Sequence, residues 1–383
     1  MFSYSKLKDR NVTASTSSKN PPSVFWFLPS YGDTRYLGDD ASTRSASIGY
    51  LRTIAQTVDR LGFDGMLLPN GGCIDPWVVA SALALETRQL KFLLAVRPGA
   101  ILPAVAASMA ASFDILTGGR LCINIVPGDN AALLSDGIAF DSSERYELAA
   151  CWTDTFRRLL RGETVTAQNR FFALQGVRSA VLPIRPDGPE IYFGGSADAA
   201  LDVAAAHTDV YLSWGEPPEQ MYEKIAAIRD RAARNGRVVR FGMRVHIVVR
   251  HTETEARNAA DALISRLTPA QIDAAQSEIA RSDSVGRQRM TRLHGGERDR
   301  VWIRPNLWAG IGLVRGGAGT AMVGCPSSIT ALMNEYRSIG VDTFILSGYP
   351  HLEEAHYVAE LLFPVLGIGR GREGAACERA MLY

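Results

Sequence analysis

Two basic side chains on one strand-like segment are the first candidates for chemistry. The segment "FGMRVHIVVR" (residues 241–250) is rich in β-forming residues, and Arg244 and His246 lie two positions apart, so both point to one face. A buried guanidinium requires an anion. No acidic residue lies on that face of the segment, so a carboxylate from elsewhere in the fold or a bound anionic ligand must balance Arg244. We favour the ligand; a satisfied polar pair in a crowded core is the alternative.

A glycine-rich turn is the second candidate. In "EIYFGGSADA", the residues Gly194, Gly195 and Ser196 close a predicted strand and open a predicted helix. Free N–H groups and the helix dipole at such a turn can bind an anion, and phosphate is the obvious one. The alternative is an ordinary turn in which Ser196 caps the helix.

Several other polar or aromatic residues follow predicted strands. Tyr31 follows the first strand, Cys73 the second and Trp214 the sixth, while Tyr349 and His351 follow the last. Cys73 has no neighbouring histidine, so a packed thiol is a better interpretation than a nucleophile. Trp214 suits either the core or a pocket wall, and the pair in "GYPHLEEA" suits the lining of a site. Arg315 lies in "VRGGAGT", whose glycines predict a segment that becomes ordered when something binds.

The composition excludes some classes of function. The chain has 383 residues, 46% of them hydrophobic, and a formal net charge of +1, without the basic excess of a nucleic-acid-binding protein. No apolar run reaches the length of a membrane span. The five cysteines are scattered without a CxxC pair, and the six histidines form no metal-ligand pattern. These features predict a cytoplasmic protein with reduced thiols and no structural metal.

Strand-like and helix-like segments alternate eight times along the chain, which predicts a parallel sheet closed into a (β/α)₈ TIM barrel. A doubly wound sheet is the alternative, but the turn after the first strand, "SYGDTRYLGD", lacks the GxGxxG pattern. We expect a flexible N-terminal arm (1–22), one barrel domain (23–370) and a C-terminal tail (371–383). Residues 268–320 form an expected insertion before the last helix–strand pair, and such insertions are often lids or oligomer arms.

Taken together, these stretches resemble the bacterial luciferase-like, two-component flavin monooxygenases, and specifically the alkanesulfonate monooxygenases. The similar segments include "LKFLLAVRP", "DSSERYE", "YFGGS", "YLSWGEPPE", "NLWAGIGLVRGGAGTAMVG" and "LSGYPHLEEA", and they extend over most of residues 25–364. The resemblance implies an FMN-dependent enzyme that uses O₂ and reduced FMN supplied by a separate NAD(P)H-dependent flavin reductase. The C–S bond of a sulfonate is cleaved to sulfite and an aldehyde. A homodimer or homotetramer is implied as well.

The resemblance also implies roles for individual residues. Arg244, His246, Trp214 and Tyr349 would cradle the sulfonate, with His246 donating a hydrogen bond or moving a proton. Arg315 would belong to a mobile lid, the Gly194–Ser196 turn would bind the FMN phosphate, and Cys73 would lie near the flavin. Tyr31 stands where the family usually has His, and the loop before Cys73 is one residue shorter. These departures at strand ends favour a bulkier, polar substrate, with sulfoquinovose as the leading candidate.

Two rival functions remain at the level of sequence. One is a barrel oxidoreductase that transfers hydride through a flavin or deazaflavin. The other is a non-catalytic carrier of flavin or sulfonate, against which the many polar residues at strand ends argue. Only a monooxygenase would release sulfite in an oxygen-dependent reaction.

Overall fold

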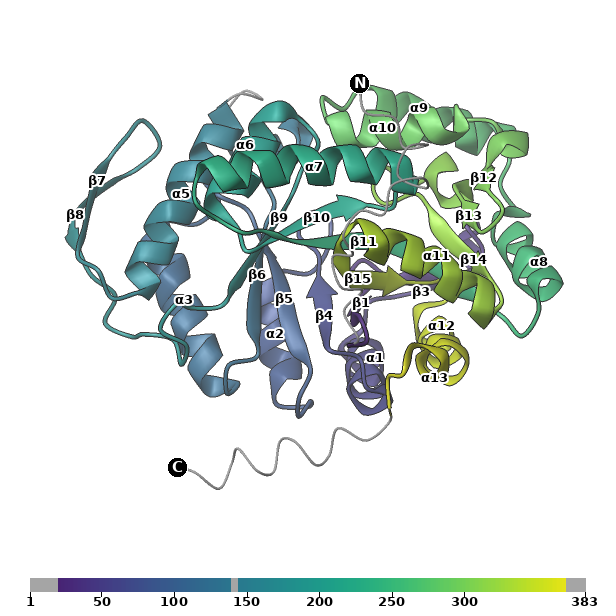
Figure 1. The fold of residues 1–383 in the computed structure, drawn as a ribbon, viewed down its shortest axis with the longest axis horizontal. Helices are drawn as coiled ribbons and strands as arrows, with labels where there is room; N and C mark the ends of the chain where they lie inside the picture. The colour runs from purple at the N-terminus through teal and green to yellow at the C-terminus, as the bar shows by residue number, and fades with distance from the viewer. Residues whose placement is uncertain (1–19, 139–143, 370–383) are drawn as a thin grey trace.

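The computed structural model describes residues 20–138 and 144–369. Its central feature is a ring of parallel strands surrounded by helices (Figure 1). The order around the ring is β1–β4–β5–β6–β9–β10–β11–β15, and the pairing of β15 with β1 closes it. The barrel strands are β1 (Ser23–Phe27), β4 (Gly65–Leu68), β5 (Lys91–Val96), β6 (Leu121–Ile125), β9 (Glu190–Gly194), β10 (Val210–Trp214), β11 (Arg240–Val249) and β15 (Val341–Ser347). The predicted (β/α)₈ TIM barrel is confirmed.

Helices cover the outside of the ring because each strand exposes apolar side chains on its outer face as well as its inner one. They are α1 (Ile48–Leu61), α2 (Pro76–Ala84), α3 (Pro103–Leu116), α5 (Glu144–Leu160), α6 (Asp198–His207), α7 (Pro218–Arg234), α8 (Glu253–Ile264), α11 (Pro326–Ile339), α12 (His351–Tyr357) and α13 (Phe363–Leu366). Helix α1 illustrates the local signals: the Ser47 side chain accepts a hydrogen bond from Tyr50 N at its start, and Gly62 ends it with a φ of 89°.

The segment 268–320 lies between α8 and the last part of the barrel, as Figure 1 shows on its right side. It contains α9 (Pro269–Ala280), α10 (Val285–His294), β12 (Trp302–Arg304) and β13 (Leu307–Trp308). A short parallel strand, β14 (Ala321–Gly324), follows it and was not predicted from the sequence. Four apolar residues beside a glycine-rich stretch give little signal; β14 forms because β11 extends beyond β10 and offers it an unpaired edge.

The remaining short elements lie in loops. They are β2 (Asp33–Thr34), β3 (Thr43–Arg44), α4 (Asn130–Ser135), β7 (Val165–Gln168) and β8 (Ala173–Val177). The β7–β8 hairpin projects from the side of the barrel (Figure 1). The expected N-terminal arm lies outside the described residues up to position 19, as does the expected tail from 371 onward.

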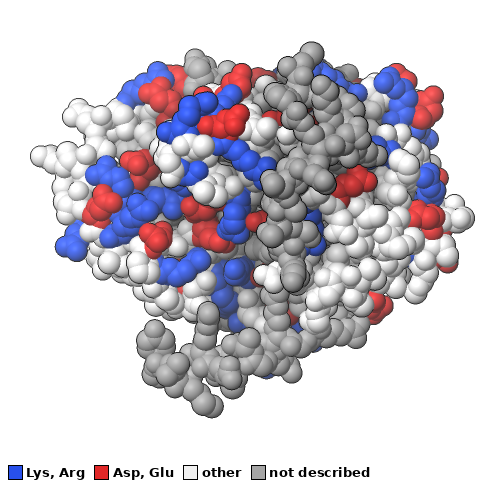
Figure 2. Space-filling view, viewed as in Figure 1, with Lys and Arg blue, Asp and Glu red and all other residues white. Residues whose placement is uncertain are grey.

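Charged side chains of both signs are mixed on the face seen in Figure 2. Many of them are paired; for example, Arg231 of α7 contacts Asp198 and Asp202 of α6. None of the helices in the described part of the chain combines the length and apolar character that a membrane crossing requires. Within the same residues, no group of three or more His, Cys, Asp or Glu side chains is arranged to hold a metal ion.

Candidate active site

The register of the barrel places Arg244 and His246 at its rim, although β11 continues for several residues. Arg244 pairs with Trp214, the last residue of β10, and His246 pairs with Ser347, the last residue of β15. The neighbouring strands therefore end at the level of this basic pair. Active sites of TIM barrels lie at this carboxyl-terminal end of the strands.

The guanidinium of Arg244 has only neutral neighbours among the described residues. Its Nη1 donates to Ser347 Oγ at 2.8 Å, and its Cζ lies 4.0 Å from the centre of the Phe27 ring. No ion pair to Arg244 is found within residues 20–138 and 144–369, and burial lowers its pKa while Tyr31 and Tyr349 oppose that effect. A guanidinium remains charged even so. The arrangement leaves a cation beside the cavity whose charge the described part of the chain does not balance.

His246 is a buried, neutral base. Its Nδ1 lies 2.8 Å from Ser347 Oγ, and its ring stacks on Tyr349 with centroids 5.3 Å apart. Burial, first of all, and then the nearby charges of Arg244 and Arg315 hold the pKa of His246 well below its ordinary value. A positive imidazolium is therefore disfavoured at neutral pH, so His246 can act as a hydrogen-bonding group there but does not add a second charge.

Arg315 approaches the same place from the inserted segment. Its Cζ lies 5.2 Å from the centre of the Tyr31 ring and 5.8 Å from that of Tyr349. Unlike Arg244, it is exposed to solvent. Tyr31 is uncharged at neutral pH, as tyrosines ordinarily are, and desolvation at the cavity together with the nearby Tyr349 raises its pKa further. Two tyrosines thus connect the mobile-lid candidate with the basic pair.

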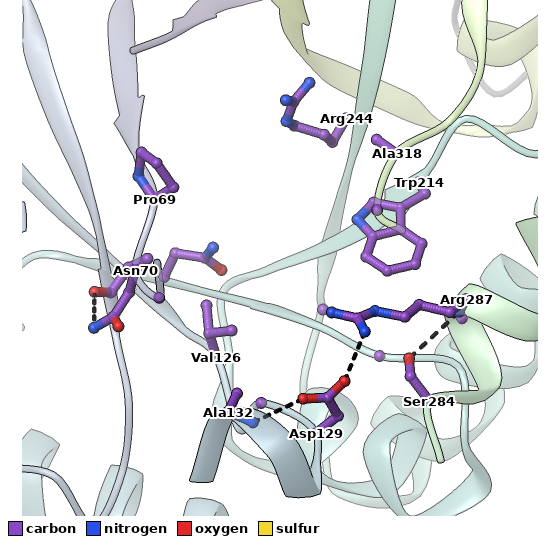
Figure 3. Close-up of a pocket in the computed structure, with 18 of the residues that line it drawn as sticks. Pro69, Asn70, Val126, Asp129, Ala132, Trp214, Arg244, Ser284, Arg287 and Ala318 are labelled. Atoms are coloured by element: carbon purple, nitrogen blue, oxygen red, sulfur yellow. Dashed lines mark hydrogen bonds and ion pairs between the residues drawn. The ribbon is translucent and has the colours of Figure 1, made fainter. Parts of the chain in front are cut away.

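A cavity of about 600 Å³ opens at this end of the barrel. Figure 3 shows Arg244, Trp214 and Ala318 on one side of it and Asn70 and Val126 on the other. The predicted site residues that line it are Tyr31, Gly194, Gly195, Ser196, Trp214, Arg244, His246, Arg315 and Tyr349. Its volume falls within the usual range for sites that bind small molecules and cofactors.

A buried lysine, Lys224, contacts the turn that was predicted to bind phosphate. Lys224 Nζ donates to Ser196 Oγ at 2.8 Å and to Glu216 Oε1 at 2.5 Å. Arg289 also contacts Glu216, at 2.6 Å. Burial favours the neutral acid, but the bonds from Arg289 and Lys224 outweigh it and lower the pKa of Glu216. Helix α6 begins directly after the turn, and no side chain caps its N-terminus. The turn can thus offer a hydroxyl and free N–H groups to an anion.

Other buried polar groups at the cavity lack partners and bear on whether FMN fits. Asn124 Oδ1 and the Nε atoms of Arg97 and Arg145 have no hydrogen-bond partner within the described chain, and all three residues line the cavity. Buried polar atoms are normally satisfied. The cavity therefore combines a turn that could bind an anion with unpaired donors and acceptors, as a ligand with a phosphate and a polar ring edge requires. These residues fit FMN.

Two predicted residues do not line the cavity. Cys73 is half-buried, its Sγ lies 3.3 Å from the Pro69 carbonyl oxygen, and burial raises its pKa, so a thiolate is disfavoured. His351 is fully buried behind Tyr349, with ring centroids 5.0 Å apart, and its Nδ1 lies 2.8 Å from Asp33 Oδ1. The structure places His351 behind a predicted substrate-binding residue rather than against the cavity itself.

Several cavity or supporting residues were not assigned a role from the sequence. Asn124 lies in β6 and Arg97 directly follows β5; the end of an apolar strand marks Arg97 as a candidate but indicates no particular role. Arg287 of α10 bonds Asp129 at 2.9 Å, a contact that Figure 3 shows. Lys224 lies in an ordinary helical pattern and carried no signal, whereas Ser347 stands at the end of the last predicted strand, a position that by itself assigns it no role.

Comparison with known proteins agrees with this geometry. The family model described as "Luciferase-like monooxygenase" matches residues 24–343. A riboflavin lyase solved with modified FMN and riboflavin is similar, with a TM-score of 0.74, 18% identity, and coverage of 91% of this chain and 92% of that one. A long-chain alkane monooxygenase gives a TM-score of 0.73 at 18% identity, with the same coverage of 91% and 92%.

The fold also occurs with a different cofactor. An F420-dependent secondary alcohol dehydrogenase, solved with an F420–acetone adduct, has a TM-score of 0.64 and 15% identity, covering 90% of this chain and 99% of that one. At these identities the likeness to solved structures shows the fold alone. Chemistry must therefore be argued from the residues of this chain.

Proposed function

The chain belongs to the luciferase-like monooxygenase family, and from that premise we propose that it is an FMN-dependent monooxygenase that cleaves the C–S bond of an organosulfonate. The observation that carries the proposal is Arg244, a half-buried cation at the cavity with only neutral neighbours in the described chain. A sulfonate is a compact anion with three acceptor oxygens. A guanidinium provides a planar fork of donors that suits such a group.

The overall reaction balances without another oxidant. Reduced FMN, O₂ and R–CH₂–SO₃⁻ would give oxidised FMN, R–CHO, hydrogen sulfite and water. Reduced FMN, when bound, supplies the electrons that activate O₂. The chain's own residues would hold the phosphate at the Gly194–Ser196 turn, bind the sulfonate through Arg244, and exclude water by closing Arg315 over the cavity.

For the substrate we propose a sulfosugar, with sulfoquinovose as the test compound. Tyr31 lines the cavity, and its raised pKa keeps the hydroxyl uncharged, able to donate or accept a hydrogen bond. Asn70 and Asn124 add further uncharged polar groups to the lining. A site built for hydroxyls disfavours an alkyl chain, because its buried polar groups would be left without partners.

The experiment measures sulfite release with reduced FMN, with and without O₂, from sulfoquinovose, octanesulfonate and methanesulfonate. We expect oxygen-dependent sulfite release and the highest kcat/KM with sulfoquinovose. A preference for an alkanesulfonate would exclude the sugar and leave the sulfonate monooxygenase intact. Oxidation without a need for O₂ would favour the hydride-transfer alternative, and binding without turnover would favour a carrier.

Two partners belong to this proposal. A separate NAD(P)H-dependent flavin reductase would supply reduced FMN. A second copy of the chain would cover the apolar outer face of α2 and α3, where Val78 is 65% and Leu116 81% exposed. Light scattering on the purified protein would give the number of subunits.

A further inference from the structure

Ser347 joins the two basic residues of the site through one hydroxyl. It is the last residue of β15 and fully buried, and it is absent from the lining of the cavity. Its Oγ lies 2.8 Å from Arg244 Nη1 and 2.8 Å from His246 Nδ1. Any influence of Ser347 on a ligand must therefore pass through these two neighbours.

The chemistry of the three groups assigns the protons. A guanidinium has only donors, so Ser347 Oγ accepts from Arg244. Within the described residues, the hydrogen-bond partners of Ser347 Oγ are Arg244 Nη1 and His246 Nδ1, so its single proton is left for His246 Nδ1, which must then have a lone pair. A neutral imidazole with a lone pair on Nδ1 carries its proton on Nε2.

This arrangement connects the barrel to the inserted segment. Ala318 is buried, lines the cavity and lies three residues after Arg315. Figure 3 shows it beside Arg244. Two residues after Ala318, the carbonyl oxygen of Thr320 accepts a hydrogen bond from His246 N at 2.9 Å. The backbone of His246 therefore holds the end of the glycine-rich segment against the barrel, and the backbone of Ala318 lies near its imidazole.

We propose that Ser347 is a positioning residue, which fixes the direction of Arg244 and holds His246 as the Nε2–H tautomer that tethers the segment ending at Thr320. In this proposal Nε2–H donates to the backbone of Ala318, so both ring nitrogens are engaged and His246 is an anchor of the lid and not a proton shuttle. The effect on Arg244 as a sulfonate ligand rests on the proposed function, whereas the tautomer and the tether do not.

The decisive test is nitrogen NMR of the protein labelled with ¹⁵N-histidine, in which the resonances of His246 are assigned with a His246→Gln variant. We expect wild-type His246 to be neutral with its proton on Nε2 between pH 6 and pH 8. Ser347→Ala should convert it to a mixture that includes the Nδ1–H form, and Ser347→Thr, which retains a hydroxyl, should restore the wild-type pattern. An imidazolium or an Nδ1–H ring in the wild type would overturn the proposal, and that readout is made on the wild-type protein and does not require Ser347→Ala to fold.

Hydrogen exchange supplies a second, independent readout. Amides of residues 315–320 should exchange about ten-fold faster in Ser347→Ala than in the wild type or Ser347→Thr, a loss consistent with one hydrogen bond. Equal exchange in all three proteins would contradict the tether.

Binding of a sulfonate, followed by Trp214 fluorescence, should weaken about ten-fold in Ser347→Ala. If no sulfonate binds the wild type while the NMR pattern is as expected, the proposed substrate fails and the role of Ser347 stands. If the wild type and Ser347→Ala bind the sulfonate equally, Ser347 does not orient Arg244.

Discussion

Lys224 is a buried cation and Arg244 a half-buried one near the same cavity, and only the charge of Lys224 is balanced by the described chain. Lys224 is 6% exposed and bonds Glu216, which is 1% exposed and also held by Arg289. Arg244 faces a serine hydroxyl and a phenylalanine ring instead. The first charge is balanced inside the described chain, whereas the second remains available to an anion from solution.

Whether a buried charge has a counter-charge in the protein helps to distinguish a structural residue from a ligand-binding one. Burying an ion costs several kcal/mol unless a counter-charge lies beside it. A paired ion such as Lys224 can support a turn, because its own requirement is already met. An unpaired ion such as Arg244 lowers stability in the free protein and recovers that free energy when the ligand binds. Each prediction below tests or refines this contrast.

The largest effect is expected on catalysis at Arg244. Arg244→Ala should lower kcat/KM for the sulfonate by about three orders of magnitude, because a charged group of the ligand would be buried without its partner. Arg244→Lys should recover about ten-fold at most, since a point charge does not reproduce the fork. Steady-state sulfite release measures both. Activity of Arg244→Ala close to that of the wild type would show that the anion binds elsewhere.

Stability should respond in the opposite order. Lys224→Met leaves Glu216 buried with one partner fewer, and we expect it to lower the free energy of unfolding by about 3 kcal/mol. Arg244→Met replaces an unbalanced cation by an apolar chain of similar length, and we expect a change within about 1 kcal/mol or a gain. Urea unfolding followed by tryptophan fluorescence compares the two. A larger loss from Arg244→Met would contradict the contrast.

The barrel and the basic pair could be predicted from sequence because their signals are local. Apolar strands followed by helical patterns define the barrel, and a two-residue spacing puts Arg244 and His246 on one face. Their position at the rim could not be predicted, since it depends on where β10 and β15 end. Lys224 and Ser347 act through contacts with residues 28 and 103 positions away, respectively. No pattern along the chain encodes such pairs.

Buried histidines show a third way to avoid an unbalanced charge, namely losing the proton. His294 of α10 is 1% exposed, and burial, with a smaller effect of Arg300, lowers its pKa to about 4. Below pH 6.5 the His294 side chain binds a proton in the unfolded chain but stays neutral in the folded one. Its contribution to the free energy of unfolding is therefore present at pH 7 and is lost as the pH falls. Between pH 7.5 and pH 5 we expect His294 to account for a loss of about 2 kcal/mol.

Urea titrations at both pH values measure this loss, with His294→Gln as the control. The variant should be less stable at pH 7.5 but should lose about 2 kcal/mol less on acidification. His246 and His351 also have lowered pKa values and remain in the variant, so part of the pH dependence should persist. An unchanged slope in His294→Gln would mean that the folded and unfolded chains bind this proton equally, so that burial does not lower the pKa of His294.

The smallest effect concerns Arg315, a cation that is neither deeply buried nor paired. It faces Tyr31 and Tyr349 from the glycine-rich segment, so closing it over a ligand would add attraction without the cost of burying it in the free protein. We expect trypsin to cleave after Arg315 about five-fold more slowly when FMN and a sulfonate are present, because the bound ligands order the segment.

Cleavage after the exposed Arg178, beyond the β7–β8 hairpin, is the internal control and should not change. Arg315→Lys keeps a trypsin site and should show weaker protection, since its ammonium matches the anion less well. Equal cleavage after residue 315 with and without ligands would show that this cation does not close on the site, and Arg244 would then be the cation that the ligand must balance alone.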